Sequence, residues 1–302
     1  TRNKFWKKYT KNNLNFWIKG YIYSHTIEKI IEICETIRID DISPFLDSIK
    51  GHFALIVQRK DITLIVVDKI RSIPLFFIKI KNDYFIDYDP KILINLTDFD
   101  KSIDENSKLE LAMSGFTIGN KTIYKNLRTL KAGEAVIFQD NNTKYLNYFK
   151  YYGKIDNKNF DHYQNELSKI TLSIFRKMIS RIGDRQIVVP LSAGNDSRLV
   201  ASVLKHLGAK NVKCYSYGTK GNFEAKIAKI IADKLGYEWR FIPLTHKSEK
   251  KFYASDEFKL YLDYSETFCS VPYFQGLSTI KYLKDLKWID NDAIFINGNT
   301  GD

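Results

Sequence analysis

The sequence predicts a two-domain chain, in which an α+β domain with antiparallel sheets precedes an α/β domain with a parallel sheet. Its 302 residues exceed what one hydrophobic core usually organises. Short strand patterns follow one another closely in the first half, whereas long amphipathic helices alternate with single apolar strands in the second. We place the boundary between residues 150 and 160, which gives domains at 1–152 and 158–302.

The first half consists of strand patterns separated by polar breaks. Residues 14–23 are rich in aromatic and β-branched side chains and predict a strand, while the isoleucines of 26–37 recur at helical spacing. The lysine-rich lead 1–10 has no strand pattern. Strand patterns in close succession then predict an antiparallel sheet: GHFALIVQ, ITLIVVD, IPLFFIKI and DYFIDYD. A helix near 104–114 and the strands GEAVIFQD and KYLNYFKY complete this half.

The second half alternates helices with strands at a spacing that indicates βαβ units and a parallel sheet. The expected elements are a helix over 161–181, a strand over 186–191, a helix over 197–207, a strand over 212–217, a helix over 222–235 and a strand over 238–242. A further strand-like segment, AIFIN, occupies 293–297.

The formal net charge of +12 raises the question of a nucleic-acid partner, because clustered Lys and Arg bind phosphates. The lysines are scattered along the sequence, so we do not expect a dedicated nucleic-acid surface. Hydrophobic residues make up 44% of the chain, which is ample for packed cores and excludes a disordered protein.

The cysteines and the apolar runs bear on the compartment. Cys34, Cys214 and Cys269 form no CxxC pair, so neither a disulfide framework nor a zinc site is expected, and a reducing environment fits best. No apolar run approaches the roughly 18 residues that span a bilayer, and residues 1–10 lack the apolar core of a signal peptide. We therefore expect a cytoplasmic protein without a membrane span.

The stretch VVPLSAGNDSRLVASVLKHLG, residues 188–208, joins a buried strand to an amphipathic helix. Ser192, Ala193 and Gly194 are small enough for backbone N–H groups to approach a ligand, and the start of a helix adds positive potential. Helix capping would explain one of the polar residues that follow. It does not explain a Ser-small-Gly-x-Asp-Ser loop at the carboxyl end of a strand, where open α/β sheets bind ligands. We therefore expect a phosphate site.

This loop has neither the Gly-Lys-Ser/Thr of the Walker pattern nor three spaced glycines. It resembles the Ser-Gly-Gly-x-Asp-Ser loop of the N-type ATP pyrophosphatases, and most of both domains is similar to the asparagine synthetase family. The stretches that carry the likeness are, in order, GHFALIV, LIVVDKIRSIPLFF, SGFTIGNKTIYKNLRTLKAGEAVIF, CYSYGTKGNFEAKIAKIIADKLG and INGNTGD. The resemblance implies an Ntn-type, glutaminase-like first domain and an adenine nucleotide α-hydrolase-like second domain.

The resemblance also implies a site and a chemistry. Asp196 and Asp302 would be catalytic and would bind Mg²⁺, and a substrate carboxylate, of aspartate or of a sugar uronic acid, would attack the α-phosphorus of ATP. Pyrophosphate would leave, and ammonia or another amine would then displace AMP to give an amide. The residues implied to bind ATP are Ser192, Ala193, Gly194, Asn195, Asp196, Ser197, Ser216, Gly218, Asn297 and Gly298.

The first domain departs from the family pattern. Glutamine-dependent members begin with a cysteine whose own α-amino group activates the thiol. This sequence begins with Thr1, and its first cysteine, Cys34, lies in an expected helix. Lys19 and Tyr21 stand where the family binds glutamine. We therefore expect a degenerate domain without glutaminase activity, with ammonia coming from solution or from a separate protein.

The second domain departs as well. Ala193 replaces a loop glycine, which is tolerable if the backbone φ there stays negative. Asn299 stands where the family usually has an acidic residue, and an asparagine cannot act as a base. The sequence ends at Asp302 inside the last motif, so we expect a chain truncated at the C-terminus.

Three alternatives remain open from the sequence. The chain could be an intramolecular amide former resembling β-lactam synthetases or lasso-peptide cyclases, a tRNA-modifying ATP pyrophosphatase, or a non-catalytic homologue. Turnover without ammonia would distinguish the first, and RNA binding with a steep salt dependence the second.

Overall fold

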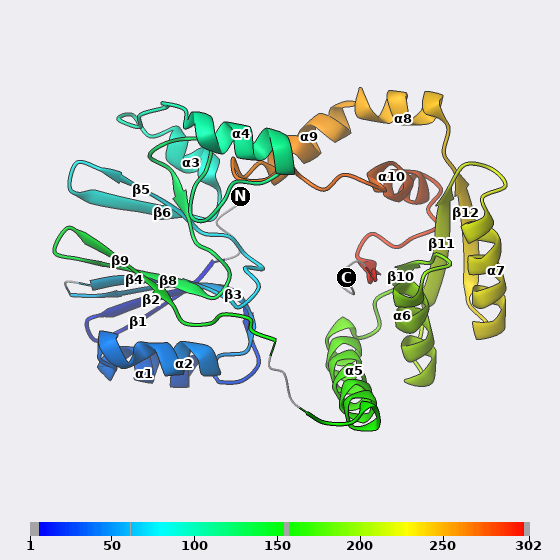
Figure 1. Cartoon of the computed structure of the whole chain (residues 1–302), viewed down its shortest axis with the longest axis horizontal. Helices are drawn as coiled ribbons and strands as arrows, with labels where there is room; N and C mark the ends of the chain where they lie inside the picture. Colours follow the sequence, from blue (N-terminus) through cyan, green and yellow to red (C-terminus); the bar gives the residue numbers. More distant parts are fainter. Residues whose placement is uncertain (1–5, 61, 154–156, 299–302) are drawn as a thin grey trace. The chain divides into compact units, whose positions relative to one another are not determined.

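The computed structural model describes residues 6–60, 62–153 and 157–298, and the chain forms two compact units (Figure 1). The first unit comprises Thr1–Lys154 together with Ser265–Pro272, and the second comprises Ile155–Tyr264 with Tyr273–Asp302. The first contains antiparallel sheets and the second a parallel sheet, which confirms the predicted fold classes.

The first unit contains two sheets. Its strands are β1 (Trp6–Lys11), β2 (Leu14–Ile22), β3 (Gly51–Arg59), β4 (Ile62–Val67), β5 (Phe76–Ile80), β6 (Asp83–Asp87), β7 (Arg128–Thr129), β8 (Glu134–Gln139) and β9 (Asn142–Asn147). Its helices are α1 (Ile27–Thr36), α2 (Ile42–Ser48), α3 (Pro90–Ile94) and α4 (Glu105–Ser114), with a 3₁₀ turn, η2 (Ile39–Asp41). A six-stranded sheet has the order β1-β2-β3-β4-β8-β9, and a three-stranded sheet has the order β6-β5-β7.

Successive side chains of a strand point to opposite faces of its sheet, so each face of the six-stranded sheet packs against a different layer. One face of the six-stranded sheet packs against α1 and α2, with Phe16 and Leu55 fully buried between them. Residues of the other face, such as Ile65, share a core with Phe77 of the three-stranded sheet. Figure 1 shows α1 and α2 on one side of the large sheet and the β5–β6 hairpin on the other.

Two expectations for this unit were wrong in detail. Residues 6–11 form strand β1, because Trp6 and Tyr9 pack into the cores on opposite faces of the large sheet and pairing with β2 outweighs the lysine-rich composition. The four strands expected in one sheet are antiparallel but divide between two sheets: β3 and β4 in the large one, β5 and β6 in the small one.

Asp68 holds the turn at which the chain crosses between these sheets. Its carboxylate is 1% exposed and accepts hydrogen bonds from the backbone N–H groups of Phe53, Ile70 and Ser72, each at 3.0 Å. The hydroxyl of Ser72 donates a fourth, at 3.2 Å. A buried carboxylate is stable in a fold only when it is bonded in this way.

The segment 265–272, which the sequence places in the second domain, lies in the first compact unit. Thr117 donates its N–H to the carbonyl of Cys269, and Val271 donates to that of Gly115. Cys269 also joins the core around Phe76 and Leu93. A stretch remote in sequence thus completes the packing of this unit.

The second unit is a parallel sheet between helices. Its elements are α5 (Phe160–Ile182), β10 (Ile187–Pro190), α6 (Asn195–His206), β11 (Val212–Gly218), α7 (Phe223–Leu235), β12 (Glu238–Pro243), α8 (His246–Tyr253), α9 (Asp256–Ser265), α10 (Leu277–Asp285) and β13 (Ile294–Phe295). The strand order is β12-β11-β10-β13, and all pairs are parallel. One face packs against α5, α6 and α7, and Leu283 of α10 packs on the other. Helices α8 to α10 were not predicted.

We expect Asp68→Ala to lower the free energy of unfolding by about 3 kcal/mol, because four donors lose their acceptor and three of them are backbone groups. Urea titration followed by circular dichroism measures the change. Asp98→Ala is the matched control, since Asp98 is exposed and makes only a surface ion pair with Lys81. Equal midpoints for the two variants would contradict the role given to Asp68.

Candidate functional site

The site is built at the carboxyl end of β10, a central strand with the parallel neighbours β11 and β13. Val188 and Val189 are fully buried, one on each face of the sheet. Leu191, directly after the strand, still donates its N–H to the carbonyl of Tyr215 at 2.8 Å. The chain therefore leaves the sheet at Ser192, in register with the end of β11.

Hydrogen bonds between the two serines fix the shape of the loop that follows. The hydroxyls of Ser192 and Ser197 lie 3.0 Å apart, and the N–H of Ser192 donates to the Ser197 hydroxyl at 3.1 Å. The N–H of Gly194 donates to the Ser192 hydroxyl, also at 3.1 Å. Ser197 is buried, so the loop is closed from within rather than held by solvent.

Helix α6 begins at Asn195, two residues earlier than predicted, and its N-cap is Gly194, which has no side chain to bond the first turn. The first turn of the helix thus contains Asn195, Asp196 and Ser197, and none of them is the N-cap. Helix capping therefore does not explain why polar residues occur at these positions. Arg198 turns back onto this loop: its Nε donates to the Gly194 carbonyl at 3.2 Å, and a second nitrogen donates to Asn195 Oδ1.

Gly298 lies directly against the first turn of α6. A Cβ atom at this position would come within 2.8 Å of both Asp196 Cβ and the Ser197 nitrogen, closer than side-chain atoms approach in proteins. The segment reaches this place because the N–H of Ile296 bonds to the carbonyl of Val188 at 3.0 Å, extending the β10–β13 pairing. Only glycine fits here without a shift of backbone.

The end of β11 supplies the opposite wall. Ser216 is buried; its hydroxyl donates to the Leu191 carbonyl at 2.6 Å and accepts from Nε1 of Trp239 at 3.0 Å. Gly218 has φ +136°, a conformation that disfavours side chains, and a Cβ there would lie 2.9 Å from the Asn222 side chain.

These segments enclose a cavity of about 450 Å³, within the usual range for small-molecule sites. Its lining residues are Pro190, Leu191, Ser192, Gly194, Asp196, Ser197, Tyr215, Ser216, Tyr217, Gly218, Asn222, Glu224, Ala225, Leu244, Gln275 and Gly298. Asp196 and Glu224 are the charged residues among them, and no Lys, Arg or His of the described chain lines it. The cavity is therefore anionic although the whole chain carries a net charge of +12.

Seven of the ten residues expected to bind a nucleotide line this cavity: Ser192, Gly194, Asp196, Ser197, Ser216, Gly218 and Gly298. Ala193 and Asn195 belong to the same loop but do not line the cavity, and Asn297 is exposed outside it. Ala193 is not among the residues with positive φ, so its replacement of a glycine causes no backbone strain. Asn299 and Asp302 lie outside the described residues.

The other nine lining residues were not among the predicted site residues: Pro190, Leu191, Tyr215, Tyr217, Asn222, Glu224, Ala225, Leu244 and Gln275. Tyr217 and Asn222 lie beside the predicted Gly218, so the end of β11 could have suggested them. Gln275 carries no sequence signal, because it lies in a loop before α10 and reaches the cavity only through the fold. Burial raises the pKa of the Tyr217 hydroxyl, and it raises that of Tyr215 to about 12, so both remain neutral donors.

In the first unit, Lys19 lies 3.2 Å from the centre of the Tyr88 ring. Burial lowers the pKa of Lys19, although Asp87 and Asp89 oppose this shift. The ring of Tyr21 contacts that of His52. Cys34 is buried in the core with α1, and burial raises its pKa to about 12, so it stays a protonated thiol at neutral pH.

Two searches of the described residues gave negative results. No cluster of three or more His, Cys, Asp or Glu side chains is placed to hold a metal ion in that part of the chain. None of its helices is both long enough and apolar enough to cross a bilayer.

Comparison with solved structures gave only weak likenesses. NH3-dependent NAD synthetase from Campylobacter jejuni has a TM-score of 0.30 at 17% identity, covering 43% of this chain and 56% of its own. Glutamine phosphoribosylpyrophosphate amidotransferase from B. subtilis has a TM-score of 0.31 at 12% identity, covering 86% and 76%. A structure titled the allosteric regulatory enzyme of purine biosynthesis has a TM-score of 0.28 at 12% identity, covering 80% and 50%. The chain thus spans little more than half of the first of these structures, and scores this low support no argument.

Comparison with families is more informative. No curated protein matches the sequence. Residues 41–152 match the glutamine amidotransferase domain family, and residues 176–255 match the asparagine synthase family. The second match contains β10, the Ser192–Ser197 loop and β11, the elements that form most of the cavity. The two matches, in this order along the chain, show that the protein has the two-domain architecture of the asparagine synthetase family.

Proposed function

We propose that the protein is an ATP-dependent amide synthetase that adenylates a substrate carboxylate and releases AMP and pyrophosphate. The observation that carries this proposal is the cavity at the carboxyl edge of the parallel sheet, between the start of α6 and the end of β11, most of whose lining residues lie inside the asparagine synthase match. Open α/β sheets bind ligands at this edge, and a helix start favours phosphate groups.

The charge of the cavity bears on the metal. A triphosphate would meet Asp196 and Glu224 but no side-chain cation among the described lining residues. Binding would therefore require a cation supplied from solution. Mg²⁺ fits, because it is usually held by one or two carboxylates together with phosphate oxygens. Asp196 would hold it, and we propose Asp302 as the second ligand by resemblance to the family.

The loop residues would bind and orient the nucleotide. Ser192, Gly194 and Ser197 present a backbone already fixed by their mutual hydrogen bonds, so little order has to be gained on binding. Bound Mg²⁺ would offset the negative charge of the phosphates. The substrate carboxylate oxygen would then form a bond to the α-phosphorus as the bond to pyrophosphate breaks, and an amine would next bond to the acyl carbon and release AMP.

The amine and the carboxylate remain proposals from the resemblance: ammonia or another amine, and aspartate or a sugar uronic acid. We further propose that the first domain has no glutaminase activity. Lys19, with its flanking carboxylates and the Tyr88 ring, replaces a neutral glutamine-binding residue, and none of the three cysteines in the sequence is accessible. Ammonia would then come from solution or from a separate protein.

We expect Asp196→Ala to abolish carboxylate-dependent release of pyrophosphate, because it removes a proposed Mg²⁺ ligand. The assay uses α-labelled ATP, Mg²⁺, ammonium and either aspartate or a panel of uronic acids, and separates AMP from ADP. Asp184→Ala is the control, since Asp184 is exposed and lies before β10, at the other end of the strand. Wild-type protein that forms ADP, or an Asp196→Ala variant with full activity, would refute the proposal.

We expect Gly298→Ala to weaken ATP binding by at least tenfold, because the new Cβ would displace the first turn of α6. Isothermal titration with MgATP measures the change. Gly153→Ala makes the same substitution in open space at ordinary φ and should bind ATP like the wild type. An unchanged affinity of Gly298→Ala for ATP would show that the nucleotide does not bind at the first turn of α6.

We expect Cys34 and Cys214 of the native protein to resist iodoacetamide at pH 8, because burial raises both pKa values to about 12. Mass spectrometry should find both alkylated rapidly in urea. Since the pKa of each thiol in the folded protein lies above its ordinary value of 9.0, the stability that these neutral thiols contribute is present below about pH 9 and is lost as the pH rises towards 12. Rapid labelling of Cys34 in the native protein would contradict this expectation and would make its thiol a candidate nucleophile.

A further inference from the structure

The two sheets of the first unit differ in width, and part of the larger one is left uncovered. The three-stranded sheet packs on the inner face of β4 and β8, where Ile65, Val67 and Val136 are fully buried. On the same face, Trp6 of β1 and Trp17 of β2 are only partly buried. The register pairs Lys8 with Trp17 and Trp6 with Lys19, so these side chains all point to the inner face.

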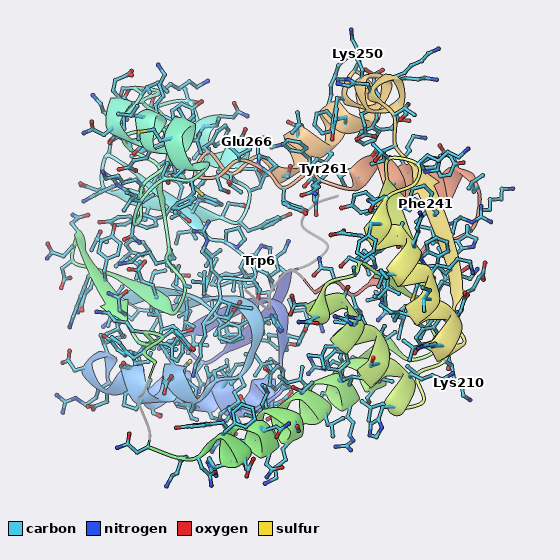
Figure 2. The ribbon with its side chains drawn as sticks, turned by 45° about the vertical axis from the view of Figure 1, so that its right-hand side comes forward. Trp6, Lys210, Phe241, Lys250, Tyr261 and Glu266 are labelled. Carbon is cyan, nitrogen blue, oxygen red and sulfur yellow. The ribbon has the colours of Figure 1, made fainter. Side chains whose placement is uncertain are left out.

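This uncovered face borders a cavity of about 680 Å³. Its floor comes from the six-stranded sheet: Trp6, Lys8, Trp17, Ile56, Gln58, Thr63 and Phe138. Its wall comes from β6 and the turn before it: Asn82, Asp83, Tyr84 and Ile86. Figure 2 labels Trp6, at the start of β1. The cavity thus lies beside one edge of the small sheet and over the aromatic part of the large one.

The edge of β6 that faces this cavity is available for pairing. Among the described strands, β6 pairs only with β5, so its other row of backbone N–H and C=O groups has no strand partner. Strands in a sheet lie about 4.8 Å apart and packed sheets about 10 Å apart. The next strand of the small sheet would therefore occupy the cavity and lie on the indole rings.

Among the described edge strands of this unit, β7 is only two residues long, and β1 and β9 are more strongly protected against such pairing than β6. Strand β1 carries three lysines in six residues, and β9, with the sequence NTKYLN, is largely exposed and polar. Charged and polar edges of this kind discourage strand addition. Between its terminal aspartates, β6 instead presents Tyr84, Phe85 and Ile86.

We propose that this cleft binds an extended segment of another protein, which adds as a fourth strand to the β6 edge of the small sheet. Main-chain hydrogen bonds to β6 supply affinity, and alternate side chains supply specificity. The side chains opposite Tyr84 and Ile86 lie over Trp6 and Trp17 and are apolar. A Lys or Arg lies opposite Asp83, which is exposed at the start of β6, because opposite charges are favourable across a strand pair.

The test titrates the purified protein with the peptide Lys-Val-Thr-Val-Thr-Val-Thr-Val-Lys and follows amide hydrogen exchange by mass spectrometry. Binding should slow exchange in residues 83–87 at least fivefold, with little change in β9, the exposed edge of the large sheet. The same peptide methylated at every backbone nitrogen keeps its side chains but cannot donate main-chain hydrogen bonds to β6, and it should not bind.

Two variants locate the floor of the site. Trp17→Glu should weaken peptide binding at least tenfold, while Tyr151→Glu, which changes an aromatic residue that is 87% exposed and does not line the cleft, should bind normally. Circular dichroism checks that both remain folded. The proposal is overturned if the peptide does not bind, if the methylated peptide binds equally well, or if the cleft is filled by a second copy of the chain, which sedimentation would detect as dimers.

Discussion

The second unit depends on the burial of β10 between two parallel neighbours. Because Val188 and Val189 pack into the cores on opposite faces and the backbone pairs with β11 and β13, this strand cannot shift without breaking both cores. Its fixed end determines where Ser192 begins the loop, where α6 starts and where Gly298 meets that helix. The cavity is thus a consequence of the sheet, and its polar groups are held by elements that have no freedom to rearrange.

The charge that lines the main polar cavity is opposite in sign to the net charge of the chain. A chain with a net charge of +12 lines its main polar cavity with two carboxylates and no described cation. If the cavity binds a nucleotide as proposed, its affinity would depend on a divalent ion instead of on lysine contacts, and the same ion would offset charge during phosphoryl transfer. A nucleic-acid site would instead need basic side chains facing the ligand.

The first unit is organised by Asp68 in a comparable way. Its bonds to three backbone N–H groups hold the turn at which the chain passes from the large sheet to the small one. The small sheet then covers only part of the large sheet, which leaves the cleft beside β6.

The sequence by itself determined most of the secondary structure, because apolar positions at helical spacing in α1, α6 and α7 and the apolar runs in β3, β4 and β10 supply buried positions of the two cores. It also indicated the loop at Ser192, since small and polar residues between a strand and a helix have few structural uses. Only the tertiary structure decided that residues 6–11 form a strand, that β3 to β6 divide between two sheets, and that residues 265–272 pack with the first unit. It alone brought Gln275 to the cavity and Gly298 to α6. Each of these depends on contacts between residues far apart in sequence, which local pattern does not encode.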